Sequence, residues 1–166
     1  MKFDKSLISV SLSVGILAGL WQVLVSVIPA DFAIPLGGVG VAGFLGWATF
    51  YAAGGKKDGL VKGTAANLTG VIWAMVIVLI MQLFNFNLLG AFLGVAVGAF
   101  MMCFQAHIKL LGFIPGAFIG CSTFFALGAT ITDVVLWPTI IGLLAGLVLG
   151  FISEWLGGLI NKYIIK

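Results

Sequence analysis

Charged side chains are scarce in this chain, and arginine is absent altogether. Only 8% of the 166 residues are charged, while 62% are hydrophobic and the mean hydropathy is +1.27. Such a chain has too few polar groups to cover a water-soluble surface, so lipid must be its solvent. The composition therefore predicts a membrane protein and excludes a soluble enzyme or binding domain.

Ionisable groups are also missing from the interior of the apolar segments. The carboxylates lie between the segments or at their ends, and the only histidine, His107, lies at the end of one segment. A carboxylate-coupled antiporter is therefore disfavoured. A sodium site formed by the backbone carbonyls of an unwound helix is an alternative that this pattern does not exclude. No Ser/His/Asp set or phosphate-binding loop is present, so we expect no enzyme activity, no catalytic residue and no cofactor.

Cysteine is rare as well. Cys103 and Cys121 both fall inside apolar segments, without a Cys-x-x-Cys partner or a histidine at ligand spacing. This pattern predicts two buried, inert thiols rather than a disulfide or a metal site.

What the chain does contain is a series of six apolar runs, each close to the roughly 20 residues that span a bilayer's hydrocarbon core. They cover residues 6–28, 32–53, 60–84, 88–106, 110–129 and 134–153. The runs use nearly all of the chain, so we expect a single membrane domain over residues 1–166 with an all-α fold. The lipid bilayer is its first expected partner.

The lysines divide the connections between these runs into two kinds. All eight lie before the first run, around the second and fourth connections, or at the end of the chain: Lys2, Lys5, Lys56, Lys57, Lys62, Lys109, Lys162 and Lys166. The first, third and fifth connections contain none. By the positive-inside rule both termini should face the cytoplasm. The net charge of +3 then reflects membrane orientation, and no nucleic-acid partner is expected.

Two segments of the chain match each other in register. Residues 44–54 read Phe-Leu-Gly-Trp-Ala-Thr-Phe-Tyr-Ala-Ala-Gly, and residues 118–128 read Phe-Ile-Gly-Cys-Ser-Thr-Phe-Phe-Ala-Leu-Gly. The match predicts a three-helix unit written twice, over residues 6–84 and 88–153. Because each unit has an odd number of spans, the halves would be inverted about an axis in the membrane plane. The alternative is chance, since glycine and phenylalanine are common here.

Small residues recur at four-residue spacing in several runs, which lets helix backbones approach closely in lipid. The predicted helix-packing glycines are Gly15, Gly19, Gly70, Gly94, Gly98, Gly142, Gly146 and Gly150. Within one chain they would form contacts between its own helices. In an accessory protein, or in a homo-oligomer, they would instead bind a partner.

Three further strings resemble a known family. Residues 70–77 (Gly-Val-Ile-Trp-Ala-Met-Val-Ile), 102–106 (Met-Cys-Phe-Gln-Ala) and 113–121 (Phe-Ile-Pro-Gly-Ala-Phe-Ile-Gly-Cys) are similar to members of DUF1097, small bacterial inner-membrane proteins without an established function. The resemblance covers most of the chain and implies a six-span protein of the bacterial cytoplasmic membrane. It supplies no substrate, cofactor or catalytic residue.

Two functional hypotheses remain. The first is a channel or uniporter for a small neutral or weakly ionising solute of unknown identity, and the second is a structural or accessory protein that packs against another membrane component. The candidate pore-lining residues are uncharged polar and aromatic side chains deep in the runs: Thr49, Phe50, Asn67, Trp73, Thr123 and Phe124. The alternative for these residues is that they pack the helices against one another.

Overall fold

The computed structural model describes residues 4–27 and 37–163, and the regular structure within these ranges is entirely helical. The helices are α1 (Lys5–Val27), α2 (Gly37–Ala52), α3 (Lys56–Leu83), α4 (Leu88–Phe104), the short 3-10 turns η1 (Gln105–His107) and η2 (Lys109–Leu111), α5 (Ile114–Ala126) and α6 (Asp133–Tyr163). The predicted all-α class is confirmed. Lys2, Lys166 and the predicted span residues 28 and 32–36 lie outside the described residues.

The helices differ in length more than the hydropathy predicts. Within the described residues, four segments are long and apolar enough to cross a membrane: α1, α3, α4 continued to His107, and α6. By contrast, α2 has 16 residues and α5 has 13, or about 24 and 20 Å at 1.5 Å per residue, against about 30 Å of hydrocarbon. The fifth apolar run begins at residue 110, but η2 and Gly112 occupy its first turn, and α5 begins only at Ile114, with Pro115 in its first turn.

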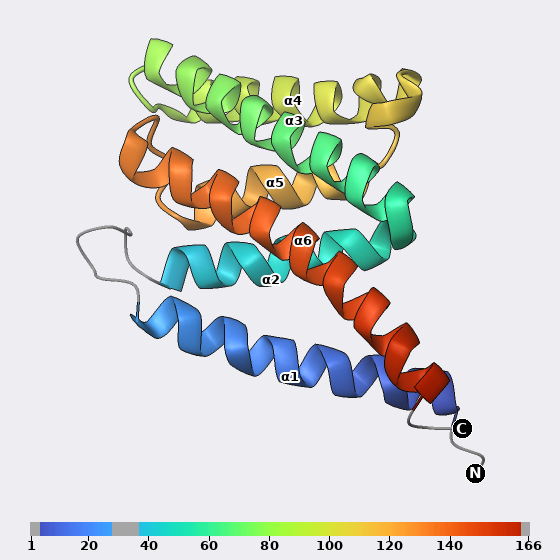
Figure 1. Ribbon diagram of the computed structural model, residues 1–166. Coiled ribbons are helices and arrows are strands. Elements are labelled where there is room, and N and C mark those ends of the chain that lie inside the picture. The colour runs from blue at the N-terminus through green and yellow to red at the C-terminus, as the bar shows by residue number, and fades with distance from the viewer. Residues whose placement is uncertain (1–3, 28–36, 164–166) are drawn as a thin grey trace.

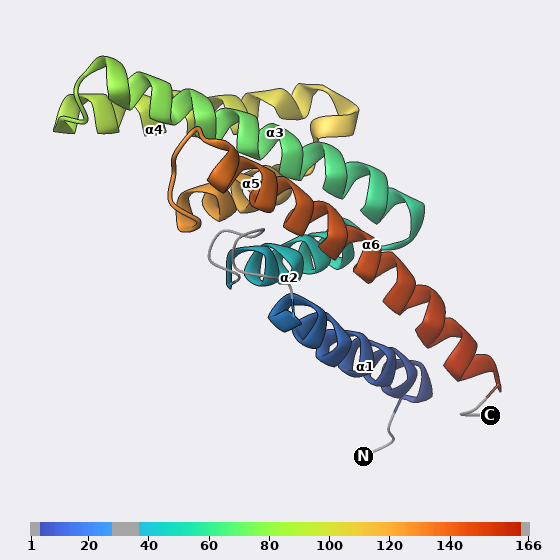
Figure 2. The ribbon, with the colours of Figure 1, turned by 60° about the vertical axis from the view of Figure 1, so that its left-hand side comes forward.

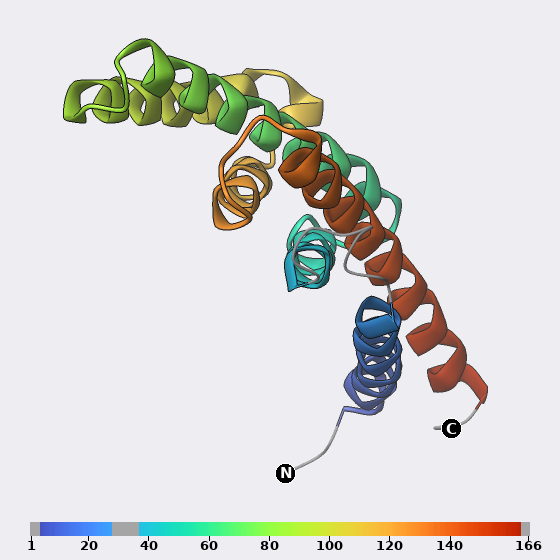
Figure 3. The same ribbon diagram turned by 90° about the vertical axis from the view of Figure 1, so that its left-hand side faces the viewer.

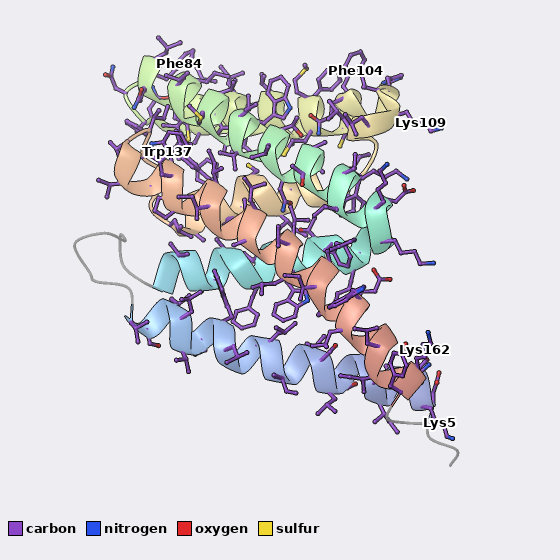
Figure 4. The ribbon with its side chains drawn as sticks, viewed as in Figure 1. Lys5, Phe84, Phe104, Lys109, Trp137 and Lys162 are labelled. Carbon is purple, nitrogen blue, oxygen red and sulfur yellow. The ribbon has the colours of Figure 1, made fainter. Side chains whose placement is uncertain are left out.

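All six α-helices run between the same two edges of the molecule (Figure 1). The α2–α3 and α4–α5 connections lie at one edge, together with the described ends of the chain. Lys5, Lys109 and Lys162 point outward along this edge, which we call the lysine edge, whereas Phe84 and Trp137 lie at the opposite edge (Figure 4). At the start of α1, Asp4 accepts hydrogen bonds from the Ser6 hydroxyl and amide, and these lower the pKa of the Asp4 carboxyl.

The helices form a curved arrangement of two layers. Viewed nearly end-on, α2 and α5 lie beside each other on the concave side, and α3 and α6 lie on the convex side (Figure 3). At one end α4 packs on α3, and at the other α1 packs on α6 (Figure 2). The most extensive contacts are those of α2 with α6 and of α5 with α3, and both join the first predicted three-helix unit to the second.

The crossing of α2 with α6 brings two backbones together. Gly46 lies against the carbonyl of Leu143, and Gly146 lies against the carbonyl of Gly43. A Cβ atom at either glycine would overlap the facing carbonyl oxygen. Gly142 also faces the backbone of α2, because a Cβ there would lie 2.9 Å from the Val39 carbonyl oxygen. Close packing of this kind is what associates helices in lipid, where water exclusion contributes nothing.

The crossing of α5 with α3 has the same construction. Gly120 lies against the carbonyl of Asn67, and Gly70 lies against the carbonyl of Ala117. Each contact matches one in the other crossing: Gly120 takes the place of Gly46, and Gly70 takes the place of Gly146. The two most extensive helix contacts therefore use glycines at corresponding positions of the two predicted three-helix units.

The remaining predicted packing glycines divide into two groups. Gly94 and Gly98 on α4 face Ile77 of α3, and Gly150 on α6 faces the side chain of Phe50, so all three lie at helix contacts. Gly15 and Gly19 do not, because both lie on the exposed face of α1 and a Cβ at either position would meet no atom within 4 Å. Gly15 and Gly19 are therefore not at a helix contact within the described part of this chain.

Candidate functional site

In α2, two predicted pore-lining residues are fully buried. The hydroxyl of Thr49 donates to the carbonyl of Leu45 at 2.9 Å, one turn back in its own helix. The ring of Phe50 packs against Gly150 and meets the Phe151 ring edge-on, with centroids 6.4 Å apart. The hydroxyl and the ring are therefore both engaged in contacts within the protein.

In α5, the matched pair is buried in the same way, and its threonine makes the equivalent hydrogen bond. The Thr123 hydroxyl donates to the carbonyl of Ile119 at 2.7 Å, and Phe124 has no exposed surface. The ring of Phe124 belongs to the main apolar core, with Phe125 edge-on to it at 6.2 Å between centroids. In this conformation all four side chains pack helices together, which is the alternative that the sequence left open.

The glycine that ends each matched segment has a capping role. In α2 the amide of Gly55 donates to the carbonyl of Phe50, and that of Gly54 donates to the carbonyl of Tyr51. These two bonds form a Schellman cap, which requires positive φ at Gly54, here 104°. In α5 the amides of residues 129 and 128 donate to the carbonyls of residues 124 and 125, and φ of Gly128 is 130°.

Asn67 lies at the centre of the molecule and has an incomplete set of hydrogen bonds. It has no exposed surface, its Oδ1 is 3.2 Å from Thr49 Oγ1, and its Nδ2 is the one fully buried side-chain polar atom without a partner in the described part of the chain. Thr49 has a single hydroxyl hydrogen, which the Leu45 carbonyl also attracts. If the amide N and O of Asn67 are exchanged, Nδ2 can donate to the Thr49 hydroxyl, but Oδ1 then takes the position without a partner.

Trp73 has hydrogen-bond partners that the other five candidates do not share. Its indole Nε1 donates to Gln105 Oε1 at 2.9 Å, and Gln105 Nε2 donates to Thr69 Oγ1 at 3.2 Å. Gln105 is only 7% exposed although it lies in η1, just past the end of α4. Three uncharged polar side chains from α3 and η1 therefore form one hydrogen-bonded chain.

This chain of polar groups borders a cavity of about 400 Å³. Its walls come from α3, α4, η1 and η2, and are mostly apolar: Thr69, Ile72, Trp73, Met101, Phe104, Gln105, His107, Ile108 and Leu111. An apolar cavity with a few converging polar groups is the usual form of a small-molecule site. We therefore take it as the candidate binding site of the protein.

His107 contributes an exposed imidazole to the same cavity. Its Nδ1 is 2.7 Å from the carbonyl oxygen of Phe104, and its ring centroid is 4.8 Å from the Phe104 ring. A carbonyl only accepts, so Nδ1 must carry the proton, and in the neutral ring Nε2 is left as an acceptor. The histidine is thus oriented by the backbone that ends α4.

Of these cavity residues, the sequence singled out only Trp73 as a pore candidate. Gln105 and His107 stand at the end of an apolar run, where polar side chains are ordinary, and the Trp73–Gln105 bond joins residues 32 positions apart. The sequence feature that pointed to Gln105 was the string at residues 102–106, which carries part of the family resemblance.

The other sites expected from the sequence can now be compared with the structure. No group of three His, Cys, Asp or Glu side chains within residues 4–27 and 37–163 is placed to hold a metal ion. Both cysteines are free. Cys121 is buried, but Cys103 is on the exposed face of α4, which corrects the expectation of two buried thiols.

These features define the class: an all-helical membrane protein whose described interior holds uncharged polar groups, with Lys5, Lys109 and Lys162 along one edge. The chain belongs to the family described as "Protein of unknown function (DUF1097)", whose model matches residues 11–158. The match confirms the resemblance drawn from the three strings.

Three curated relatives show the same relationship. The chain is 34% identical to "Uncharacterized protein YahC" of Escherichia coli K12 over an alignment of 165 residues that covers 96% of each chain. It is 38% identical to "Inner membrane protein YcdZ" of E. coli K12 over 150 residues, 87% of this chain and 82% of that one. The YcdZ protein of Salmonella typhimurium is 35% identical over 149 residues, 87% and 83% of the two chains. No solved structure matches.

Proposed function

We propose that this chain is a uniporter of the bacterial inner membrane for a small neutral or weakly ionising solute. In this proposal six helices cross the membrane as an inverted three-plus-three repeat, and both termini face the cytoplasm. The observation that carries the proposal is the equivalence of the two crossings, in which Gly46 faces Leu143 as Gly120 faces Asn67. Inverted repeats that meet at the bilayer midplane are the architecture of many secondary transporters.

Two further features support the inverted repeat. The hydrogen bonds of Thr49 and Thr123 and the two Schellman caps recur at the same offset of 74 residues as the matched segments. Around them, α1 packs on α6 as α4 packs on α3. An axis that exchanges the halves would account for both.

The proposed orientation rests on the two edges of the molecule. The lysine edge collects Lys5, Lys109 and Lys162, and the opposite edge has the aromatic Phe84 and Trp137 (Figure 4). Lysine-rich ends face the cytoplasm, and aromatic residues favour the membrane interfaces. The short α2 and α5 are flanked by longer helices, so local thinning of the bilayer or polar connections would complete their crossing. The names of the YcdZ relatives support an inner-membrane location.

The chemistry of the interior favours an uncharged solute and a carrier over an open channel. The polar groups deep in the protein are amides and hydroxyls, such as Asn67 and Gln105, and burying an ion among them would be costly. Thr49, Phe50, Thr123 and Phe124 are packed between the helices, so a route past them would have to open by movement of one half against the other.

The test is solute flux into proteoliposomes containing the purified protein, followed by light scattering after an osmotic step. We expect uptake of a subset of small neutral solutes, saturation at high concentration, and no uptake of their permanently charged analogues. Liposomes without protein are the control. Rates equal to this control across a panel of polyols, amides and weak organic acids in their neutral forms would contradict the proposal.

A second candidate function has its own observation. At Gly15 and Gly19 on the exposed face of α1, an added Cβ would meet no atom of the described residues within 4 Å. Such a face fits an accessory protein or a homo-oligomer that packs through α1. The test is to introduce cysteines at these two positions and to treat native membranes with a thiol crosslinker. Adducts of one defined mass, together with absent flux, would favour the accessory function.

A further inference from the structure

We propose that the cavity between α3, α4 and the two 3-10 turns binds a small uncharged amphiphile, with a compact apolar body and one hydroxyl, amide or protonated carboxyl end. The inference rests on the proposed function, because we take the bound ligand to be of the same chemical class as the transported solute. Binding itself can be measured whether or not transport occurs.

The apolar body is set by the walls of the cavity. Met101 and Phe104 come from α4, Ile72 from α3, and Ile108 and Leu111 from the segment that follows α4. A volume of about 400 Å³ lies in the lower part of the range of small-molecule sites. It fits a ligand built on one ring or a short branched chain, and is too small for a whole phospholipid.

The polar end of the ligand is set by Gln105. A primary amide donates two hydrogen bonds and accepts two, and Gln105 spends one of each on Thr69 and Trp73. One N–H and one lone pair remain at a residue that is 7% exposed and borders the cavity. Unspent hydrogen-bonding capacity next to lipid is costly, so a ligand that supplies a partner is favoured. His107 offers an acceptor on the same wall.

The absence of charge in the lining argues for an uncharged ligand. Lysine, aspartate and glutamate do not occur among the nine lining residues. The nearby Lys109 and Asp58 belong to a separate recess of about 340 Å³. The cavity is half-open, and an ion in it would give up part of its hydration without gaining a counter-charge from the lining residues. A lipid acyl chain would satisfy the walls but would leave the free groups of Gln105 without a partner.

The experiment is ¹⁹F NMR of 4-fluorobenzyl alcohol and 4-fluorobenzamide, titrated with the full-length protein in lipid nanodiscs. Empty nanodiscs of the same lipid correct for partitioning into the bilayer. We expect a saturable bound signal for both compounds, which the unlabelled compounds displace. We expect none for 4-fluorobenzyltrimethylammonium, which has a similar ring but a permanent charge.

Matched variants locate the binding. Gln105→Met keeps the length of the side chain without its amide, and should weaken binding about tenfold, as expected for the loss of hydrogen bonds to a polar ligand end. Gln22→Met makes the same change on the exposed face of α1, where the Gln22 amide donates a hydrogen bond to Ser26 in its own helix, and should leave binding unchanged. If Gln105→Met does not fold, Met101→Trp fills the cavity from another wall and should abolish binding.

Several results would overturn the inference. They are the absence of a saturable signal above empty nanodiscs, equal binding of the ammonium compound, or wild-type binding by folded Gln105→Met or Met101→Trp protein. A cavity filled by a lipid chain would give the first of these results. Binding without flux would support this inference and contradict the uniporter. Flux without binding at this cavity would support the uniporter and contradict this inference.

Discussion

Glu154 on α6 accepts a hydrogen bond at 2.6 Å from the backbone amide of Lys56, the first residue of α3. The amides of a helix's first turn lack partners within the helix, and its N-terminus carries a partial positive charge. No side chain of the preceding turn caps α3, whose N-cap residue is Gly55. The carboxylate of α6 thus takes over the capping of α3 and connects the end of the chain to the α2–α3 turn.

The first prediction follows from this bond. Glu154→Ala should lower the free energy of unfolding by about 1 to 2 kcal/mol, because it removes both the acceptor and the charge. Glu154→Gln keeps an oxygen at the same place and should lose less. Asp58→Asn, which removes the exposed ion pair with Lys62 at 2.8 Å, should have little effect. Thermal unfolding in detergent measures all three, and equal midpoints for Glu154→Ala and wild type would show that the bond does not stabilise α3.

The second prediction compares two glycines that the sequence does not distinguish. Gly146→Ala places a methyl group against the carbonyl of Gly43, so the α2–α6 crossing must separate, at a cost of about 1 to 3 kcal/mol. Gly19→Ala adds the same methyl group where no atom lies within 4 Å, and should be neutral or slightly stabilising through helix propensity.

Folded yield and thermal midpoints of the two purified variants test this prediction. Leucine in place of alanine should widen the difference. If Gly19→Leu instead reduces the size of a complex while the chain stays folded, the exposed face of α1 contacts a partner, as the accessory-protein hypothesis requires. Equal tolerance at both positions would remove Gly146 from the crossing.

These two glycines also show how far the sequence reaches. Four-residue spacing of small residues is visible at Gly15 and Gly19 and at Gly142 and Gly146, but only a helix's position in the bundle decides which of its faces meets another helix. Apolar runs predict that helices exist, because lipid leaves the backbone few alternatives. They do not predict that α5 starts at Ile114, which depends on the local turn chemistry of Gly112 and Pro115.

The candidate site was less accessible to prediction. The matched segments pointed to Thr49, Phe50, Thr123 and Phe124, and the structure gives each pair the same packing role. These residues match in register because they occupy equivalent packing positions at the two helix crossings. The cavity beside Trp73 depends on Gln105, which comes from a 3-10 turn that hydropathy cannot reveal, and its hydrogen bond joins two helices.

The third prediction concerns orientation. Reporter fusions at residues 29–35, 85–87 and 130–132 should report the outer face of the membrane, and those at residues 55–59, at His107 and at the C-terminus should report the cytoplasm. The reason is the lysine edge, which gathers Lys5, Lys109 and Lys162 on one side (Figure 4). Since α2 and α5 are short, fusions on both sides of each are the decisive ones. An outer C-terminus would contradict both the six spans and the inverted repeat.

The last prediction tests whether the packed aromatic pair closes the solute route. Phe50 and Phe124 are fully buried at equivalent positions, so replacing either by alanine leaves a cavity and should cost about 3 to 5 kcal/mol of stability. Leucine fills more of the space, and the double variant Phe50→Leu, Phe124→Leu is therefore better suited to flux measurements.

In a uniporter whose halves move about the axis between these residues, replacing both rings with the smaller leucine side chain should raise solute uptake or ion leak above wild type. Each single variant should have a similar, smaller effect, because the two sites are equivalent under the repeat. Uptake in proteoliposomes, normalised to folded protein, provides the comparison. Unchanged permeability in a folded double variant would leave Phe50 and Phe124 with packing alone, and the route would then have to be sought at the Trp73–Gln105 cavity.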